Sequence, residues 1–267
     1  MENKNTKSFQ EKVVDQQKTV TPDNNKQISQ DGFPDGTKVK PSNPKSGVKS
    51  AMVALLMLFA IGSNAQNSDT VSLTHKAYVS VFAKSSHIPV MVYYTLHDKD
   101  LNCKTRVPRS NNFKADPLLA GTNLGADYDK SGYDQGHNMS AQDNMCDATC
   151  MNECFYFTNM FPQTPNLNRG VWKKLEVEER TMASLYGSIV VYIGSYQKDK
   201  TIGPDKVVVP GYCWKVIYLP TTNTWFEYIF PNADSCPGDP SNYMKINRDQ
   251  HDWMQYCVKR WSGNKIP

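Results

Sequence analysis

Four scarcities in this sequence of 267 residues exclude broad classes of protein. Its 15 glycines and 16 prolines are too few for a collagen-like or fibrous chain. The only long apolar run, residues 51–62, is too short for a membrane-spanning helix, which needs roughly twenty residues, so a polytopic membrane protein is excluded. The net charge of +4 gives no general reason to expect a nucleic acid or a membrane as a partner.

The first 50 residues differ in composition from the rest of the chain. They contain no cysteine, arginine or tryptophan, and their only aromatic residues are Phe9 and Phe33. Prolines at four positions would interrupt any helix, and the apolar surface is too small to offset the entropy cost of ordering the chain. The sequence therefore predicts that residues 1–47 are a disordered polar extension.

Residues 48–65 have the parts of a secretory signal peptide. Lysines precede the apolar run, and small residues that end at Ala65 follow it. Such a signal normally begins a chain, and translation from Val48 would explain the polar residues ahead of it. We expect cleavage after Ala65 and a mature chain that begins at Gln66. A buried apolar helix and a membrane anchor are the alternatives for this segment.

All seven cysteines follow this segment, and their density is typical of an oxidising compartment. The sequence predicts a secreted or periplasmic protein with at least two disulfides and, after signal cleavage, no stable membrane partner. Because seven is an odd number, at least one thiol is free or pairs outside the chain, and the spacing leaves the connectivity open. The cysteines are Cys103, Cys146, Cys150, Cys154, Cys213, Cys236 and Cys257.

The remaining chain, residues 66–267, is predicted to form one domain of the α+β class, with a central antiparallel sheet flanked by helices. β-Branched and aromatic runs predict strands, apolar residues at helical spacing predict helices, and turn residues predict a loop-like stretch over 102–130. The predicted strands are 77–82, 89–95, 189–195, 212–219 and 224–230, and the predicted helices are 168–186 and 248–260, the second capped by Asn247.

One face of the first predicted helix carries polar residues of chemical interest. Asn168, Trp172, Glu176 and Arg180 recur every four residues, so they would form one slanting ridge. An amide oxygen and a carboxylate suit a hard cation that keeps most of its water, such as Mg²⁺. The spacing of Glu176 and Arg180 is also that of an ordinary surface salt bridge.

His137 adds a candidate base to this set. It follows Gly136, whose backbone can make a tight turn. An isolated histidine is more often structural, but a neutral imidazole beside a cation can take a proton from water while the cation stabilises charge on a phosphate. A base, an amide, a carboxylate and an arginine together are the groups that phosphodiester hydrolysis needs.

Three blocks of residues carry a family resemblance. They read Asp-x-Gly-His at 134–137, Asn-x-x-Pro-Gln at 159–163 and Leu-Asn-x-Gly-x-Trp-x-x-Leu-Glu-x-x-x-Arg at 167–180. This pattern resembles the DNA/RNA non-specific endonuclease family, of the Serratia-nuclease type with a ββα-metal active site. The resemblance covers roughly residues 75–260 and implies an endonuclease domain over 66–267.

The resemblance implies a role for each matching residue. His137 would be the general base that activates water. Asn168 would be the direct ligand of Mg²⁺, for which Mn²⁺ could substitute, and Glu176 would hold water molecules on the metal. Arg180 would contact the scissile phosphate.

Further positions have supporting roles by the same resemblance. Asn159 would orient the site, and Asp134 would be structural. Arg109 is the candidate for an upstream phosphate-binding arginine, with Arg106 as the alternative because loop length leaves the register open.

One position departs from the family pattern. Gln135 stands where the family usually has arginine, and a neutral hydrogen bond to phosphate is roughly half as strong as a charge-assisted one. The expected function is Mg²⁺-dependent hydrolysis of DNA and RNA without sequence or sugar specificity. The alternative is a catalytically weakened nuclease fold that binds nucleic acid or a protein. A zinc site formed by His137 with Cys146, Cys150 and Cys154 is a further alternative.

Overall fold

The computed structural model describes residues 69–244. The predictions for residues 1–47, for residues 48–65 and for the helix at 248–260 with its Asn247 cap therefore lie outside the described residues. Within 69–244, no helix is both long enough and apolar enough to cross a membrane.

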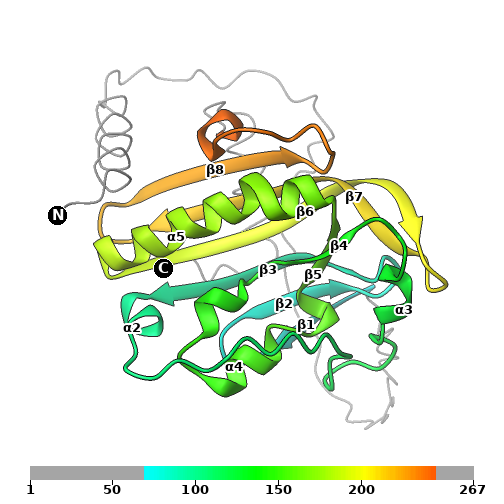
Figure 1. Ribbon diagram of the computed structural model, residues 1–267, viewed down its shortest axis with the longest axis horizontal. Coiled ribbons are helices and arrows are strands. Elements are labelled where there is room, and N and C mark those ends of the chain that lie inside the picture. Colours follow the sequence, from blue (N-terminus) through cyan, green and yellow to red (C-terminus); the bar gives the residue numbers. More distant parts are fainter. Residues whose placement is uncertain (1–68, 245–267) are drawn as a thin grey trace, which may run out of the picture. The chain divides into compact units, whose positions relative to one another are not determined.

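A six-stranded antiparallel sheet forms the centre of the described domain, and its strand order is β1-β2-β3-β6-β7-β8 (Figure 1). Its strands are β1 (Thr70–Thr74), β2 (Val79–Ala83), β3 (Ile88–His97), β6 (Ser188–Ile202), β7 (Val207–Leu219) and β8 (Thr224–Pro231). A second antiparallel sheet consists of β4 (Asp134–His137) and β5 (Met160–Gln163). The predicted α+β class with a central antiparallel sheet is confirmed.

One long helix, α5 (Lys173–Tyr186), lies along one face of the large sheet (Figure 1). The other helices are short: α2 (Asp98–Leu101), α3 (Gly125–Tyr128), α4 (Ala148–Glu153), the 3₁₀ turns η1 (Ala141–Asn144), η2 (Phe157–Asn159) and η4 (Pro240–Tyr243), and the π-helical η3 (Leu167–Trp172). Leu175 and Met182 of α5 are fully buried against the sheet, which is the core side that their spacing predicted.

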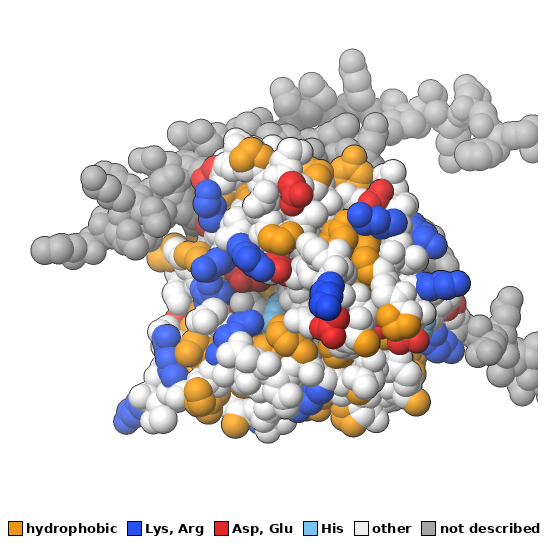
Figure 2. Space-filling model, turned by 45° about the vertical axis from the view of Figure 1, so that its right-hand side comes forward, with side chains coloured by type: hydrophobic (Ala, Val, Ile, Leu, Met, Phe, Trp, Pro, Cys, Tyr) orange, Lys and Arg blue, Asp and Glu red, His pale blue; other side chains and the backbone are white. Residues whose placement is uncertain are grey.

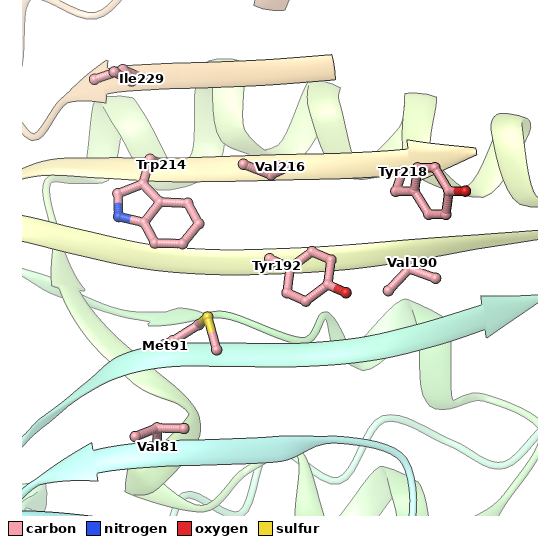
Figure 3. Packing of buried hydrophobic residues seen from close by; sticks show 8 residues of the cluster. All are labelled: Val81, Met91, Val190, Tyr192, Trp214, Val216, Tyr218 and Ile229. Carbon is pink, nitrogen blue, oxygen red and sulfur yellow. The ribbon is translucent and has the colours of Figure 1, made fainter. Parts of the chain in front are cut away.

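The other face of the large sheet carries an apolar cluster to which five strands contribute (Figure 3). Trp214 of β7 lies across Gly194 of β6, its partner in the ladder, and a Cβ at residue 194 would overlap the indole. Only glycine fits at that position. The cluster consists of Val81, Met91, Val190, Tyr192, Trp214, Val216, Tyr218 and Ile229.

Strands that contain runs of β-branched and aromatic residues were predicted, whereas the short strands β1, β4 and β5 were not. The predictions at 77–82, 89–95 and 224–230 match β2, β3 and β8, but those at 189–195 and 212–219 cover only part of β6 and β7. The outer part of β6 is polar and that of β7 is a valine run followed by Pro210 and Gly211, and these parts are strands because they pair with each other. β1, β4, β5 and α4 were missed, and the loop-like stretch over 102–130 contains the short α3.

Candidate active site

The β4–β5 hairpin and the helix that follows it supply a ββα arrangement. Asp134 pairs with Gln163 and His137 with Met160, so the whole of β4 is held in register by β5. The side chain of Gln163 occupies the space that a Cβ at Gly136 would need. β4 is polar and contains a glycine, which disfavours a strand by composition, so its pairing with β5 makes it one.

A cleft of about 610 Å³ opens between this hairpin and α5. Six of the predicted site residues line it: His137, Asn168, Glu176, Arg180, Arg109 and Gln135. Basic side chains gather along one part of the protein surface beside acidic ones (Figure 2), and the charged residues that line the cleft are Arg109, Asp129, Lys130, Asp134, Arg169, Lys173, Glu176 and Arg180.

His137 is held in a buried, aromatic setting. Its ring centroid lies 4.8 Å from that of Phe155 and 5.4 Å from that of Phe113. Burial, with a smaller effect of the nearby Arg109 guanidinium, lowers the pKa of His137 to about 3, against the opposing effect of a hydrogen bond to the Gln135 backbone. The ring is therefore neutral at pH 7, and its Nε2 has no hydrogen-bond partner among the described residues.

Asn168 is fixed by its amide nitrogen. The Nδ2 group donates a hydrogen bond to Asp134 Oδ2 at 2.9 Å. Asp134 also accepts two hydrogen bonds from the Arg169 guanidinium, at 2.6 and 2.8 Å. Asp134 thus orients Asn168 so that its Oδ1 oxygen is left for another partner.

Asn168 lies in a π-helical turn rather than in the continuous helix predicted over 168–186. Gly170 has non-helical dihedral angles (φ −99°, ψ −112°) inside this turn. A π turn holds more residues than an α turn, so a four-residue spacing does not keep side chains in line across it. Trp172, predicted on the polar ridge, is consequently 0% exposed, and its indole N–H donates to the backbone oxygen of His137 at 3.3 Å.

Glu176 and Arg180 have partners that the sequence did not reveal. Glu176 Oε2 accepts a hydrogen bond from the Ser140 hydroxyl at 3.1 Å. Arg180 forms an ion pair at 2.9 Å with Asp143, whose carboxylate is fully buried. Burial raises the pKa of Asp143 to about 6 although Arg180 opposes the shift. No local signal marks Ser140 or Asp143, which contact residues about 36 positions later in the chain.

The structure separates the two arginines that the sequence left open. The Arg109 guanidinium lies 5.0 Å from the centre of the Phe155 ring at the cleft, whereas Arg106 donates to the backbone oxygen of Leu101 and does not line the cleft. Of the two arginines, Arg109 is therefore the one that lines the cleft.

Asn159 does not reach the cleft. Its buried side chain donates to the backbone oxygens of Met139 and Cys154 and accepts from the backbone nitrogen of Met139. These bonds hold the chain that directly follows His137.

The cysteines do not form the zinc site considered from the sequence. Cys146 is bonded to Cys103, and burial raises the pKa values of Cys150 and Cys154 to about 12. Over residues 69–244, no group of three or more His, Cys, Asp or Glu side chains could hold a metal ion. The expected second disulfide is also not found among the six described cysteines, four of which are free.

A paired hairpin and a helix that present a histidine and an asparagine to one cleft define the class of ββα-metal nucleases. The chain belongs to the DNA/RNA non-specific endonuclease family, whose sequence model matches residues 57–260.

Several known proteins are similar to this chain. Mitochondrial endonuclease G from Bos taurus is 33% identical over 123 residues, which are 40% of this chain and 41% of that protein. Mitochondrial nuclease 1 from Schizosaccharomyces pombe is 34% identical over 186 residues, which are 60% of this chain and 58% of that protein. A crystal structure of the EndoG/EndoGI complex matches 73% of this chain and 86% of the compared chain, with a TM-score of 0.61 and 25% identity. The chain thus spans about two to three fifths of these curated relatives.

The prediction of a secreted or periplasmic protein is wrong. The relatives from Bos taurus, Schizosaccharomyces pombe and Saccharomyces cerevisiae are named as mitochondrial nucleases. The prediction rested on the signal-like segment 48–65, which lies outside the described residues, and on cysteine density, and the structure shows the weakness of the second argument. Cys154, Cys213 and Cys236 are buried free thiols, which pack like small apolar residues in any compartment.

Proposed function

We propose that the protein hydrolyses phosphodiester bonds of DNA and RNA with the help of a divalent cation, without sequence or sugar specificity. The observation that carries this proposal is the meeting of a neutral His137, Asn168 and Glu176 in one cleft with Arg109 and Arg180. Phosphate contacts carry no sequence information, which fits a non-specific enzyme.

The donor set of the cleft fits Mg²⁺. The Asn168 amide nitrogen is engaged by Asp134, so Oδ1 would be the direct ligand. The Glu176 carboxylate lines the same cleft and would hold water molecules on the ion. Few protein ligands and several waters are typical of Mg²⁺, and Mn²⁺ accepts the same oxygen donors. The bound cation supplies positive charge that stabilises negative charge on the phosphate.

His137 is suited to take a proton from the attacking water. Its ring is neutral at pH 7, and the hydrogen bond to the Gln135 backbone leaves the unpartnered Nε2 as the acceptor. Phe113 and Phe155 fix the ring plane. Arg109 and Arg180 would bind phosphate oxygens as charge builds up on them.

Replacement of the proposed metal ligand tests the proposal most directly. We expect the full chain to nick plasmid DNA and degrade RNA only with Mg²⁺ or Mn²⁺. Asn168→Ala should raise the Mg²⁺ concentration at half-maximal rate by about 10- to 100-fold, because a direct oxygen ligand is lost. Asn166→Ala is the matched control, since Asn166 is an exposed amide of the same segment that binds the Asp234 backbone. An unchanged Mg²⁺ dependence in Asn168→Ala would refute the assignment.

The missing family arginine allows a gain-of-function experiment. Gln135 lines the cleft, and its backbone forms a hydrogen bond with His137. A change of the side chain at residue 135 leaves this backbone bond in place. Gln135→Arg should preserve kcat/KM on plasmid DNA or raise it by up to about tenfold, because a charged donor binds phosphate more strongly. Gln142→Arg adds the same charge at an exposed place on the cleft and serves as the control. A catalytically weakened binding protein would remain inactive in both variants, and a large loss in Gln135→Arg would show that Gln135 makes its own specific contact.

A further inference from the structure

The outer part of the β6–β7 hairpin extends beyond the large sheet as a two-stranded arm (Figure 1, yellow). Its neighbours end earlier, because β3 pairs with β6 only as far as Gly194 and β8 pairs with β7 only from Tyr212. The tip is fastened to α3, since the backbone nitrogen of Asp205 donates to Asp127 Oδ1 at 2.7 Å. Tyr128, the next residue of α3, lines the cleft, so the arm is fixed beside the cleft.

Lys200 of this arm contacts the rim of the cleft. Its Nζ lies 5.1 Å from the centroid of the Tyr133 ring, and a hydrogen bond to Tyr133 raises the pKa of Lys200. Tyr133 lines the cleft and directly precedes β4. Lys200 is exposed and makes no ion pair within the part of the chain that the structure describes. The arm thus places an accessible positive charge and an aromatic ring at the edge of the site.

Two of the arginines that line the cleft are already paired with carboxylates. Arg169 is paired with Asp134, and Arg180 is paired with Asp143. Gln135 brings no charge, which leaves Arg109, Lys130 and Lys173 as the other basic residues of the lining. A long anionic substrate would therefore gain from a cation outside the centre of the cleft, since the affinity of proteins for nucleic acids depends on the number of phosphates that they neutralise.

We propose that Lys200 and Tyr133 form a subsite for the nucleic-acid strand that flanks the scissile bond, which rests on the proposed function. Lys200 binds a backbone phosphate as a point charge, and Tyr133 holds the lysine in place and offers its ring edge to the neighbouring nucleotide. Both contacts are independent of sequence and of the sugar, as the proposed specificity requires.

The position of the subsite can be estimated along β4. Tyr133 stands four positions before His137, and an extended chain advances about 3.3 Å per residue, so the subsite lies roughly 13 Å from the proposed base. The phosphates of one strand recur about every 3.4 Å along the axis of a duplex and lie roughly twice as far apart in an extended single strand, so the contact falls about two to four nucleotides from the cleaved bond. Short substrates should not reach Lys200, whereas long ones should.

Binding without turnover tests the subsite. Fluorescence anisotropy would compare full-chain His137→Ala with the double variant His137→Ala/Lys200→Ala, on single-stranded DNA of about 2 and about 16 nucleotides. For the long strand we expect the Kd to rise about three- to fivefold and the slope of log K against log salt to fall by about 0.7, the loss of one phosphate contact. The short strand should bind both variants equally.

Further variants separate the subsite from other effects. Lys99→Ala, made in the same background, removes an equal charge from an exposed residue of α2 outside the cleft and should leave both strands unaffected. Tyr133→Phe should keep most of the binding, and Tyr133→Leu should lose as much as Lys200→Ala.

Three outcomes would overturn the proposal. They are equal binding of the long strand by the Lys200→Ala and Lys99→Ala proteins, equal weakening of the short and long strands, and no binding of nucleic acid by any protein. Anisotropy needs no hydrolysis, so it separates the two proposals. If the wild-type protein does not cleave DNA but the Kd for the long strand still depends on Lys200, the subsite is supported and only the proposed function is refuted.

Discussion

Replacement of His137 by alanine will lower kcat for DNA hydrolysis by about 10²- to 10⁴-fold, the usual contribution of a general base. The loss follows from the position of the ring, which is neutral at pH 7 and has an unpartnered Nε2 in the cleft lining. The Mg²⁺ concentration at half-maximal rate should stay unchanged, since the proposed metal ligands remain. Plasmid nicking under saturating Mg²⁺ measures the effect.

Two further measurements distinguish loss of a base from loss of structure. His87→Asn removes an imidazole outside the cleft and keeps a residue that tolerates the positive φ of 55° found there, so its rate should equal that of the wild type. Added imidazole should restore part of the rate of His137→Ala, because the cavity left between Phe113 and Phe155 can admit it. Near-wild-type nicking by His137→Ala would rule out the proposed mechanism.

The second large effect concerns stability. Lys215 of β7 and Glu179 of α5 form an ion pair at 2.9 Å, and both side chains are completely buried. Lys215 Nζ also lies 4.3 Å from the centre of the Trp172 ring, which belongs to the same π-helical turn as Asn168. Lys215→Ala should lower the free energy of unfolding by about 3–5 kcal/mol, because it leaves a buried carboxylate without its partner. Urea unfolding followed by fluorescence measures this loss.

The pH dependence of this variant has a definite sign. Burial raises the pKa of Glu179 to about 7 even with Lys215 present, and removal of the lysine raises it further. A folded-state pKa above that of the unfolded chain gives stability that is lost as pH rises through it. Lys215→Ala should therefore be closer to wild-type stability at pH 5 than at pH 8. The double variant Lys215→Met/Glu179→Leu should recover most of the loss at both pH values, and failure to do so would show that the pair has another role.

The sequence predicted the residues that line the cleft better than the residues that hold them in place. His137, Asn168 and Glu176 lie in local motifs whose spacing fixes residue type and order, so their meeting in one cleft could be expected. The residues that support them come from distant positions: Ser140 donates to Glu176, and Lys215 lies over the ring of Trp172, whose indole N–H donates to the His137 backbone. Such contacts depend on how α5 crosses the sheet, which no local pattern records.

The errors also have local physical causes. The predicted helix over 168–186 missed the π turn because Gly170 reads simply as a weak helix former. Helical spacing then placed Trp172 on the polar ridge, whereas the turn rotates it into the core. The polar β4 was missed because only its ladder with β5 makes it a strand.

The disulfide between Cys103 and Cys146 spans 43 positions and closes part of the chain into a covalent ring. Arg109 and His137 both belong to this ring, as does Asp143, the partner of Arg180. A protease that cuts the exposed loop around Arg109 once would break the backbone but leave the two fragments joined by the disulfide. The cut protein would keep its proposed base and its proposed phosphate-binding arginine on one covalently connected molecule, and the fragments would separate only after reduction.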